Sequence, residues 1–178
     1  MVQKAEPWKE VSREVMFEKF GRGIEKVVFE LPDGRRDDYY IKTESNPVAV
    51  LALTKDKQVI LAKQFRPGPN KVLVELPGGG TEKGEEKIVS MERELLEETG
   101  YKGKMEFVTS LIDCGYSNRI KNCFVATDCV KISKPKNDQN EFIEVELKSL
   151  KEFRKLLQSG QSTDIEIGYL ALDYLQLL

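Results

Sequence analysis

Two neighbouring runs of the chain, at residues 47–54 and 58–66, are largely apolar. They read PVAVLALT and QVILAKQFR, and only a polar break at residues 55–57 separates them. A strand with one face in water alternates apolar and polar residues, whereas a strand buried on both faces does not. These runs therefore predict the centre of a sheet that is covered on both faces by helices.

The period of the apolar pattern changes further along the chain. A third strand, KVLVELP, is followed by a segment in which Ile88, Met91 and Leu95 recur at i, i+3 and i+7. This spacing is typical of one face of an amphipathic helix. Gly100 follows where a glycine commonly ends a helix. The pattern predicts a helix between residues 85 and 99.

Strands are expected again at MEFVTSLI, NCFVATDCV and EFIEVEL. Two capping-box patterns follow, SLKE at residues 149–152 and TDIE at residues 163–166, and each opens an apolar-periodic run. We expect terminal helices at about 149–158 and 164–177. The elements together predict an α+β fold, an α/β/α sandwich around a mixed sheet.

The first 44 residues have a different pattern from the rest. EVMFEKFGRGIEKVVFEL and DDYYIKT are strand-like and are joined by a Pro-Asp-Gly turn at residues 32–34. We interpret residues 1–44 as an antiparallel β-meander that forms a small separate sheet, and residues 45–178 as the main domain.

Composition excludes several chemistries. The chain contains no histidine, so no histidine triad, base or metal ligand is available. Its 28 Lys and Arg against 30 Asp and Glu give a formal net charge of −2, which offers no basic surface for nucleic acid or an acidic membrane. No run suits a signal peptide or membrane helix. Cys114, Cys123 and Cys129 lack zinc-site spacing, so we expect reduced thiols in a cytoplasmic protein.

The chemistry is expected where a glycine loop meets a run of carboxylates. Glu94, Glu97 and Glu98 are three and four residues apart, so on a helix they share one face. Such a face could simply be solvated. The run, however, follows the loop Pro-Gly-Gly-Gly at residues 77–80, where glycine lets backbone approach another group closely. Clustered oxygens beside such a loop favour a hard divalent cation.

This segment resembles the Nudix box, Gx5Ex7REUxEExGU, in which U is a bulky apolar residue. The matching positions are Gly79, Glu85, Arg93, Glu94, Leu95, Glu97, Glu98, Gly100 and, as a looser fit for the last U, Tyr101. The resemblance implies a Nudix hydrolase, which splits a nucleoside diphosphate linked to another group. It also implies that Arg93 pairs with Glu85 and holds the box in shape.

The same resemblance implies a metal site. Its ligands would be the Gly78 carbonyl and the carboxylates of Glu94, Glu97 and Glu98, with Mg²⁺ as the ion and Mn²⁺ as a substitute. Catalysis would be metal-assisted attack of water. The catalytic carboxylate is expected at Glu141, in a loop after the box, or within the box at Glu97 or Glu98.

Segments outside the box are similar to the ADP-ribose pyrophosphatase branch of the family. They are QFRPG at residues 64–68, ELPGG at residues 75–79, EFIEV at residues 141–145 and the N-terminal meander. In that branch the N-terminal strands join a partner subunit, which implies a homodimer. The resemblance implies substrate contacts from Arg66, whose guanidinium suits a diphosphate, and from Glu75. Phe17, with Trp8 and Phe20 as alternatives, is a candidate to stack on the base.

The sequence departs from the family pattern at two places, which leaves the catalytic base and the substrate open. Gln139 stands where some members carry a glutamate, which leaves the base to Glu141 or the box. Asp113–Asn118 replaces a Ser-Pro-Gly-like turn, so GDP-mannose or another nucleotide sugar or dinucleotide competes with ADP-ribose. A non-catalytic Nudix module that senses a nucleotide sugar is the alternative from another class.

Overall fold

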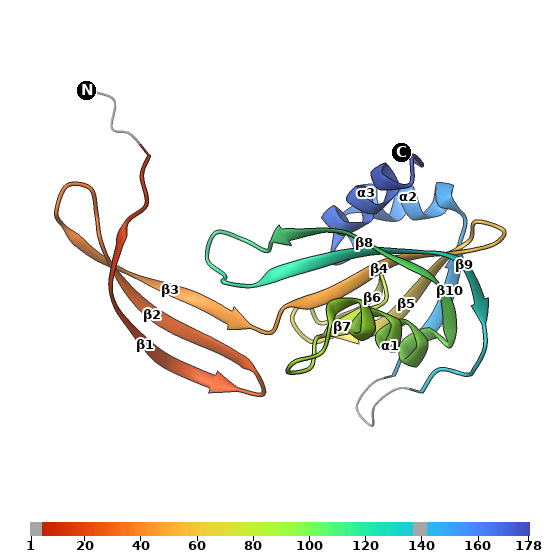
Figure 1. Ribbon diagram of the computed structural model, residues 1–178, viewed down its shortest axis with the longest axis horizontal. Helices are drawn as coiled ribbons and strands as arrows, with labels where there is room; N and C mark the ends of the chain where they lie inside the picture. The colour runs from red at the N-terminus through yellow and green to blue at the C-terminus, as the bar shows by residue number, and fades with distance from the viewer. Residues whose placement is uncertain (1–4, 137–141) are drawn as a thin grey trace. The chain divides into compact units, whose positions relative to one another are not determined.

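The computed structural model describes residues 5–136 and 142–178, which form two compact units. One unit contains the residues up to Ser45 together with Ile112–Ile120. The other contains Asn46–Leu111 and Lys121–Leu178. A three-stranded sheet belongs to the first unit and a seven-stranded sheet to the second (Figure 1).

The larger sheet is mixed. Its strands are β4 (Pro47–Thr54), β5 (Val59–Arg66), β6 (Lys71–Glu75), β7 (Gly78–Gly80), β8 (Tyr101–Ile112), β9 (Ile120–Lys131) and β10 (Glu144–Lys148). They follow the order β10-β5-β4-β9-β8, with β6 beside β5 and β7 beside β4. β4 pairs parallel to β9 and antiparallel to β5 and β7.

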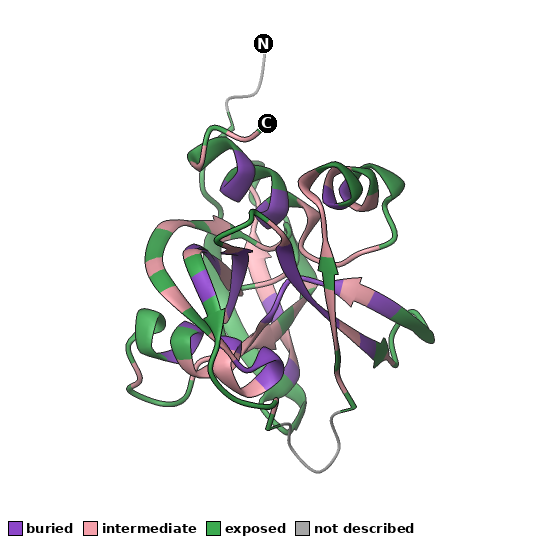
Figure 2. Ribbon diagram, turned by 90° about the vertical axis from the view of Figure 1, so that its right-hand side faces the viewer, coloured by how far each residue is buried: buried purple, intermediate pink, exposed green. Residues whose placement is uncertain are grey.

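Helices cover both faces of this sheet: α1 (Lys87–Thr99) packs on one face, and α2 (Leu150–Ser159) and α3 (Ile165–Tyr174) pack on the other. Successive residues of β4 alternate between the two cores, and all from Val48 to Leu53 are buried. The α1 core includes Val48, Val50, Ala52, Ile60, Met91, Leu95 and Phe124. The opposite core includes Ala49, Leu51, Leu53, Leu61, Phe153, Ile167 and Leu172. Figure 2 shows buried residues on the strands and on the helices beside them. The predicted α/β/α sandwich is confirmed.

The helix predicted between residues 85 and 99 is present as α1. Gly100 ends it in the left-handed conformation, φ 76°, and donates its N–H to the Leu96 carbonyl. Met91 and Leu95 are buried as expected, whereas Ile88 is 38% exposed. The helix therefore buries only part of the predicted stripe, and its remaining faces are free to carry charge.

Of the two predicted capping boxes, one is confirmed and one is wrong. The Ser149 hydroxyl accepts from the Glu152 N–H, and the Glu152 carboxylate accepts from the Ser149 N–H. At the second site the N-cap of α3 is Asp164, with φ 53° and no side-chain cap. The Thr163 hydroxyl instead donates to the Glu75 carboxylate, so a tertiary contact replaces the local cap.

The smaller sheet is the antiparallel meander that the sequence predicts. It contains β1 (Lys9–Lys19), β2 (Arg22–Glu30) and β3 (Arg36–Glu44) in that order. The predicted turn joins β2 to β3, where Gly34, at φ 82°, donates its N–H to the Leu31 carbonyl. Every residue of β1 is exposed.

The connection between β8 and β9 joins the free edge of β3. Lys42 donates its N–H to the Tyr116 carbonyl at 2.9 Å and accepts from the Asn118 N–H at 3.2 Å. The Tyr116 ring stacks on Tyr39, with centroids 6.5 Å apart. The Arg119 guanidinium also forms an ion pair with Glu44. The loop singled out for substrate identity is thus held by the smaller sheet.

All three cysteines are free: Cys114 is exposed, and Cys123 and Cys129 are buried. Burial raises the pKa of the Cys123 thiol to about 12 and that of Cys129 to about 11. The two thiols therefore stay protonated and pack as small apolar groups. Within the described residues, no helix combines the length and apolar character needed to cross a membrane.

Candidate active site

The glycine loop before α1 brings backbone against two carboxylates. Gly78 donates its N–H to Glu98 Oε2 at 2.9 Å, and Glu98 is buried. A Cβ on Gly79 would lie 2.5–2.6 Å from the carboxylate atoms of Glu94, so a side chain there would displace that carboxylate. The Pro77 carbonyl accepts from the Val50 N–H at 3.0 Å and ties the loop to β4. Loop and helix are thus closely fitted.

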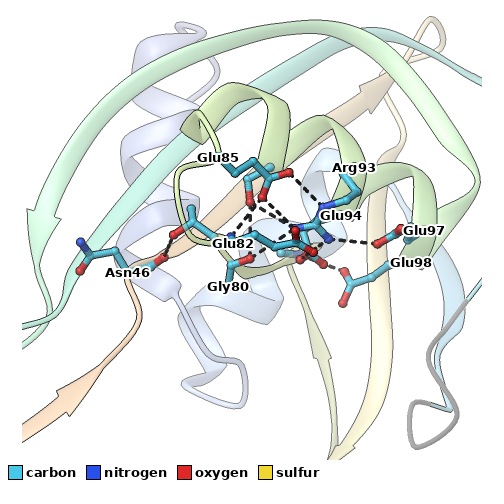
Figure 3. A network of polar contacts seen from close by, with 11 residues as sticks. Asn46, Gly80, Glu82, Glu85, Arg93, Glu94, Glu97 and Glu98 are labelled. Atoms are coloured by element: carbon cyan, nitrogen blue, oxygen red, sulfur yellow. Dashed lines mark hydrogen bonds and ion pairs between the residues drawn. The ribbon is translucent and has the colours of Figure 1, made fainter. Parts of the chain in front are cut away.

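Arg93 lies at the centre of the carboxylate network (Figure 3). Its Nε and Nη2 donate to the two oxygens of Glu85, each at 3.1 Å, which makes a bidentate pair. Nη1 donates to Glu94 at 2.9 Å and to Glu97 at 3.1 Å. Nη2 also reaches the Gly80 carbonyl at 3.4 Å. The pairing of Arg93 with Glu85 is the one that the resemblance implied.

The electrostatics of the network follow from the hydrogen bonds that one guanidinium makes with three carboxylates. The hydrogen bonds from Arg93 lower the pKa of the Glu85 carboxyl to about 2. The bonds to Glu85 and the nearby charge of Glu94 raise the pKa of Arg93 further above its usual value. One guanidinium nevertheless faces three carboxylates, so the local charge stays negative and favours a cation.

The side chains at the loop offer a set of oxygen donors to a divalent metal. Glu94, Glu97 and Glu98 lie on α1 beside the Gly78 backbone, and all would offer oxygen, the donor that Mg²⁺ prefers. In the described part of the chain, however, no three acidic or cysteine side chains converge closely enough to hold an ion together. Arg93 and the Gly78 N–H engage these carboxylates instead. The chemistry of the donors fits the ion, but their present arrangement does not enclose one.

A second arginine–carboxylate pair lies on the β5–β6 hairpin and joins Arg66, the last residue of β5, to Glu75, the last residue of β6. Arg66 donates from Nε to Glu75 Oε2 at 2.7 Å, and the other oxygen of Glu75 accepts from the Thr163 hydroxyl. The Glu75 side chain is 1% exposed, whereas that of Arg66 is 40% exposed. Ile60, an even number of residues before Arg66 in β5, packs in the core on the α1 face. By strand alternation Arg66 is therefore on that face too.

The structure thus places Glu98 against Gly78 and Glu94 against Gly79, and Arg93 joins Glu94 and Glu97. It also pairs Arg66 with Glu75. Phe17 lies in β1 with an exposed ring, and among the described residues it takes part in no ring–ring contact. Trp8 instead packs against Phe29 and Tyr39, with centroids 6.2 and 5.6 Å away. Glu141 lies outside the described residues.

Thr163 makes a contact with Glu75 that the sequence did not predict. Its position before an apolar run suggested a helix cap, and its actual partner, Glu75, is 88 residues away. No local signal in the sequence indicates this contact.

A mixed sheet between helices, with a glycine loop and a carboxylate helix on one face, defines the Nudix class of hydrolases. Comparison with known proteins agrees: the family profile of the NUDIX domain matches residues 45–167. The chain belongs to the Nudix family, and we interpret the site as that of a Nudix hydrolase.

Individual relatives cover most of the chain. An ADP-ribose pyrophosphatase of Bacillus subtilis (strain 168) is 35% identical, with 95% of this chain and 92% of that protein aligned. A methanol dehydrogenase activator of Bacillus methanolicus is 33% identical, over 83% of this chain and 81% of that protein. A crystal structure of an ADP compounds hydrolase superimposes with a TM-score of 0.79, covering 99% of this chain and 100% of that one. At 19% identity this last likeness shows the shared fold.

Proposed function

We propose that this protein hydrolyses the diphosphate bond of ADP-ribose, or of a related nucleoside diphosphate sugar, to a nucleoside monophosphate and a sugar phosphate. The observation that carries the proposal is the complete Nudix box, with Arg93 tied to Glu85 and the carboxylates of Glu94, Glu97 and Glu98 intact. The B. subtilis relative, which bears the name ADP-ribose pyrophosphatase, supports the choice of substrate.

The reaction would require Mg²⁺, or Mn²⁺ in its place, held by Glu94, Glu97, Glu98 and the Gly78 carbonyl. When bound, such an ion neutralises charge on the diphosphate and lowers the pKa of a coordinated water. The bidentate pair with Glu85 would keep Arg93 in place and preserve the shape of the loop. Glu97, whose side chain is 46% exposed, is the most accessible of the three carboxylates.

Arg66 would bind the diphosphate. It lies on the face of the sheet that carries α1, its side chain is partly exposed, and its Nη1 and Nη2 groups are not used in the contact with Glu75. A guanidinium presents paired N–H donors that match phosphate oxygens. Glu75 is proposed to act at the same subsite, and Phe17 or Trp8 to stack on the base.

The catalytic carboxylate would be Glu141, or Glu97 or Glu98 within the box. The residue before the undescribed segment is held at the box, because Lys136 donates its N–H to the Glu97 carbonyl at 2.7 Å. Glu141→Gln is expected to lower kcat more than about tenfold with little change in KM. Turnover close to that of the wild type would remove Glu141 from the mechanism.

We further propose that the protein is a homodimer formed through β1. β1 is an exposed edge strand, and it carries the exposed apolar side chains of Val11, Val15, Met16 and Phe17. Such an edge is suited to pairing with another chain. Val15→Lys should shift the mass measured by light scattering toward the monomer, and an unchanged mass would contradict pairing through β1. We also propose a cytoplasmic location, because the free thiols suit a reducing compartment.

The activity is tested on purified protein with Mg²⁺ and a panel of ADP-ribose, GDP-mannose, UDP-glucose, NADH, ATP and diadenosine polyphosphates. Products are separated by chromatography. We expect kcat/KM for ADP-ribose to exceed that of the others at least about tenfold, with AMP released. A preference for another nucleotide sugar would retain the mechanism and change the substrate.

The double variant Glu97→Gln, Glu98→Gln separates an enzyme from a sensor. An enzyme should lose nearly all Mg²⁺-dependent turnover, because both changes remove charged oxygen donors. If the wild-type protein binds ADP-ribose by calorimetry but turns over nothing with Mg²⁺ or Mn²⁺, the enzymatic proposal is wrong and the protein is a binding module.

A further inference from the structure

Glu75 is a buried carboxylate whose two oxygens are both engaged by side chains. Oε2 accepts from Arg66 Nε at 2.7 Å, and Oε1 accepts from the Thr163 hydroxyl. With only 1% of the Glu75 side chain exposed, water contributes little to its solvation. A buried charge of this kind requires specific partners, so the orientation of its carboxylate is set by these two contacts.

Arg66 is engaged from one side only. Its Nε is bound to Glu75, and within the described residues its guanidinium makes no other hydrogen bond. The guanidinium is planar, so fixing Nε on a rigid acceptor restricts the directions of the remaining N–H groups. Those groups, on a side chain that is 40% exposed, stay available to an anion.

Thr163 is held firmly enough to orient Glu75. It precedes α3, and the residue before it is fixed to the same strand as Glu75, because Ser162 donates its hydroxyl to the Val74 carbonyl at 2.8 Å. Asp164, which follows, adopts φ 53°, a left-handed conformation rare for residues with a side chain. The loop therefore takes an uncommon backbone form while two consecutive hydroxyls bind β6.

We propose that Thr163 is a positioning residue for the substrate's diphosphate: its hydroxyl orients Glu75, and Glu75 orients Arg66. This inference rests on the proposed function, since it takes Arg66 as a ligand of the diphosphate. It assigns the loop between α2 and α3, which contains no box residue, a part in substrate binding. Losing the hydroxyl leaves the Glu75 carboxylate with one partner, and Arg66 then loses its fixed orientation.

The test is a double-mutant cycle on ADP-ribose hydrolysis with Thr163→Val, Arg66→Lys and their combination. Thr163→Val removes the hydroxyl at nearly constant shape, and Arg66→Lys removes the planar fork but keeps a cation beside Glu75. We expect Thr163→Val to raise KM about threefold to tenfold with kcat changed less than about twofold. In the Arg66→Lys background the same change should have little further effect, because it acts through the guanidinium.

Two controls separate positioning from general damage to the loop. Thr163→Ser keeps the hydroxyl and should restore KM, whereas Ser149→Ala removes a hydroxyl that caps α2 and should leave KM unchanged. Melting temperatures are measured for every variant. Equal losses in both backgrounds, or a Thr163→Val variant with a lowered melting temperature and normal KM, would show that Thr163 only stabilises the fold.

Binding of ADP, measured by calorimetry without turnover, separates failure of this inference from failure of the proposed function. If ADP-ribose is not hydrolysed, but Thr163→Val lowers ADP affinity in the wild type and lowers it no further in Arg66→Lys, the positioning role holds and the proposed function fails. If Arg66→Lys weakens ADP binding and Thr163→Val does not, the inference fails alone. If neither hydrolysis nor ADP binding is found, both are wrong.

Discussion

Arg93 and Arg66 belong to the same unit, but their surroundings differ in a way that separates two kinds of polar network. Arg93 contacts three carboxylates and a carbonyl, all within residues 80–97. Arg66 contacts one carboxylate, Glu75, whose second partner is Thr163 in a distant part of the chain. The first network is local and rich in negative charge, and the second is buried and long-range.

The two networks differ in how easily their carboxylates can exchange hydrogen-bond partners. A carboxylate near water, such as that of Glu97, can exchange a hydrogen bond with Arg93 for a bond to a cation at low cost. Glu75 has no such freedom, because any partner it loses must be replaced in the interior. We therefore expect the Arg93 network to respond to Mg²⁺ and the Arg66 network to be insensitive to it.

Arg66→Ala should have the largest effect on stability. It leaves the Glu75 charge buried with only the Thr163 hydroxyl bound to it, so we expect the free energy of unfolding to fall by about 3 kcal/mol at pH 7. Urea unfolding followed by circular dichroism measures the change. Arg93→Ala is the matched control: its loss should be smaller and should be recovered on adding Mg²⁺. A larger loss of unfolding free energy in Arg93→Ala, or recovery of the stability of Arg66→Ala by Mg²⁺, would contradict the expected difference between the two networks.

Gly79→Ala should reduce activity with little cost in stability. The added Cβ would lie 2.5–2.6 Å from the Glu94 carboxylate, a flexible group that can move away. Displacing a proposed metal ligand should lower kcat/KM at least about tenfold. In Gly78→Ala the Cβ would lie 2.2 Å from the Val48 carbonyl, so backbone must shift and stability should fall as well. Normal kcat/KM in Gly79→Ala would show that Glu94 does not need its present place.

Ser149→Ala tests a hydroxyl whose hydrogen-bond partner, Glu152, is close in the sequence. Ser149 and Thr163 occupy the same place in two similar sequence patterns, but only Ser149 caps its helix. Ser149→Ala should cost about 1 kcal/mol of stability and leave KM unchanged. Thr163→Val should instead raise KM. Equal changes in KM for both variants would mean that the two hydroxyls do not differ in role.

Ser149 and Thr163 also show which features of the structure the sequence predicts and which it does not. Alternation and capping depend on neighbours within a few residues, so the buried β4, the end of α1 at Gly100 and the Ser149 cap were all predictable. The box carboxylates were predictable because one loop and one helix hold them. Thr163 was misassigned because a buried carboxylate competes with the local cap, and that competition depends on the folded chain.

The smallest effect is expected from Glu85→Gln, which keeps a hydrogen-bond acceptor for Arg93 but removes the charge. Since the folded protein holds the Glu85 pKa at about 2, below the ordinary 4.5, the carboxylate stabilises the fold above pH 4.5. That contribution is lost as the pH falls through about 2, below which the carboxyl is protonated in both states. The wild type should therefore be more stable than Glu85→Gln at pH 7, and the difference should narrow between pH 4.5 and 2. Urea unfolding at pH 7, 4 and 2.5 measures this, and a difference that does not vary with pH would mean that Arg93 does not act on the charged form of Glu85.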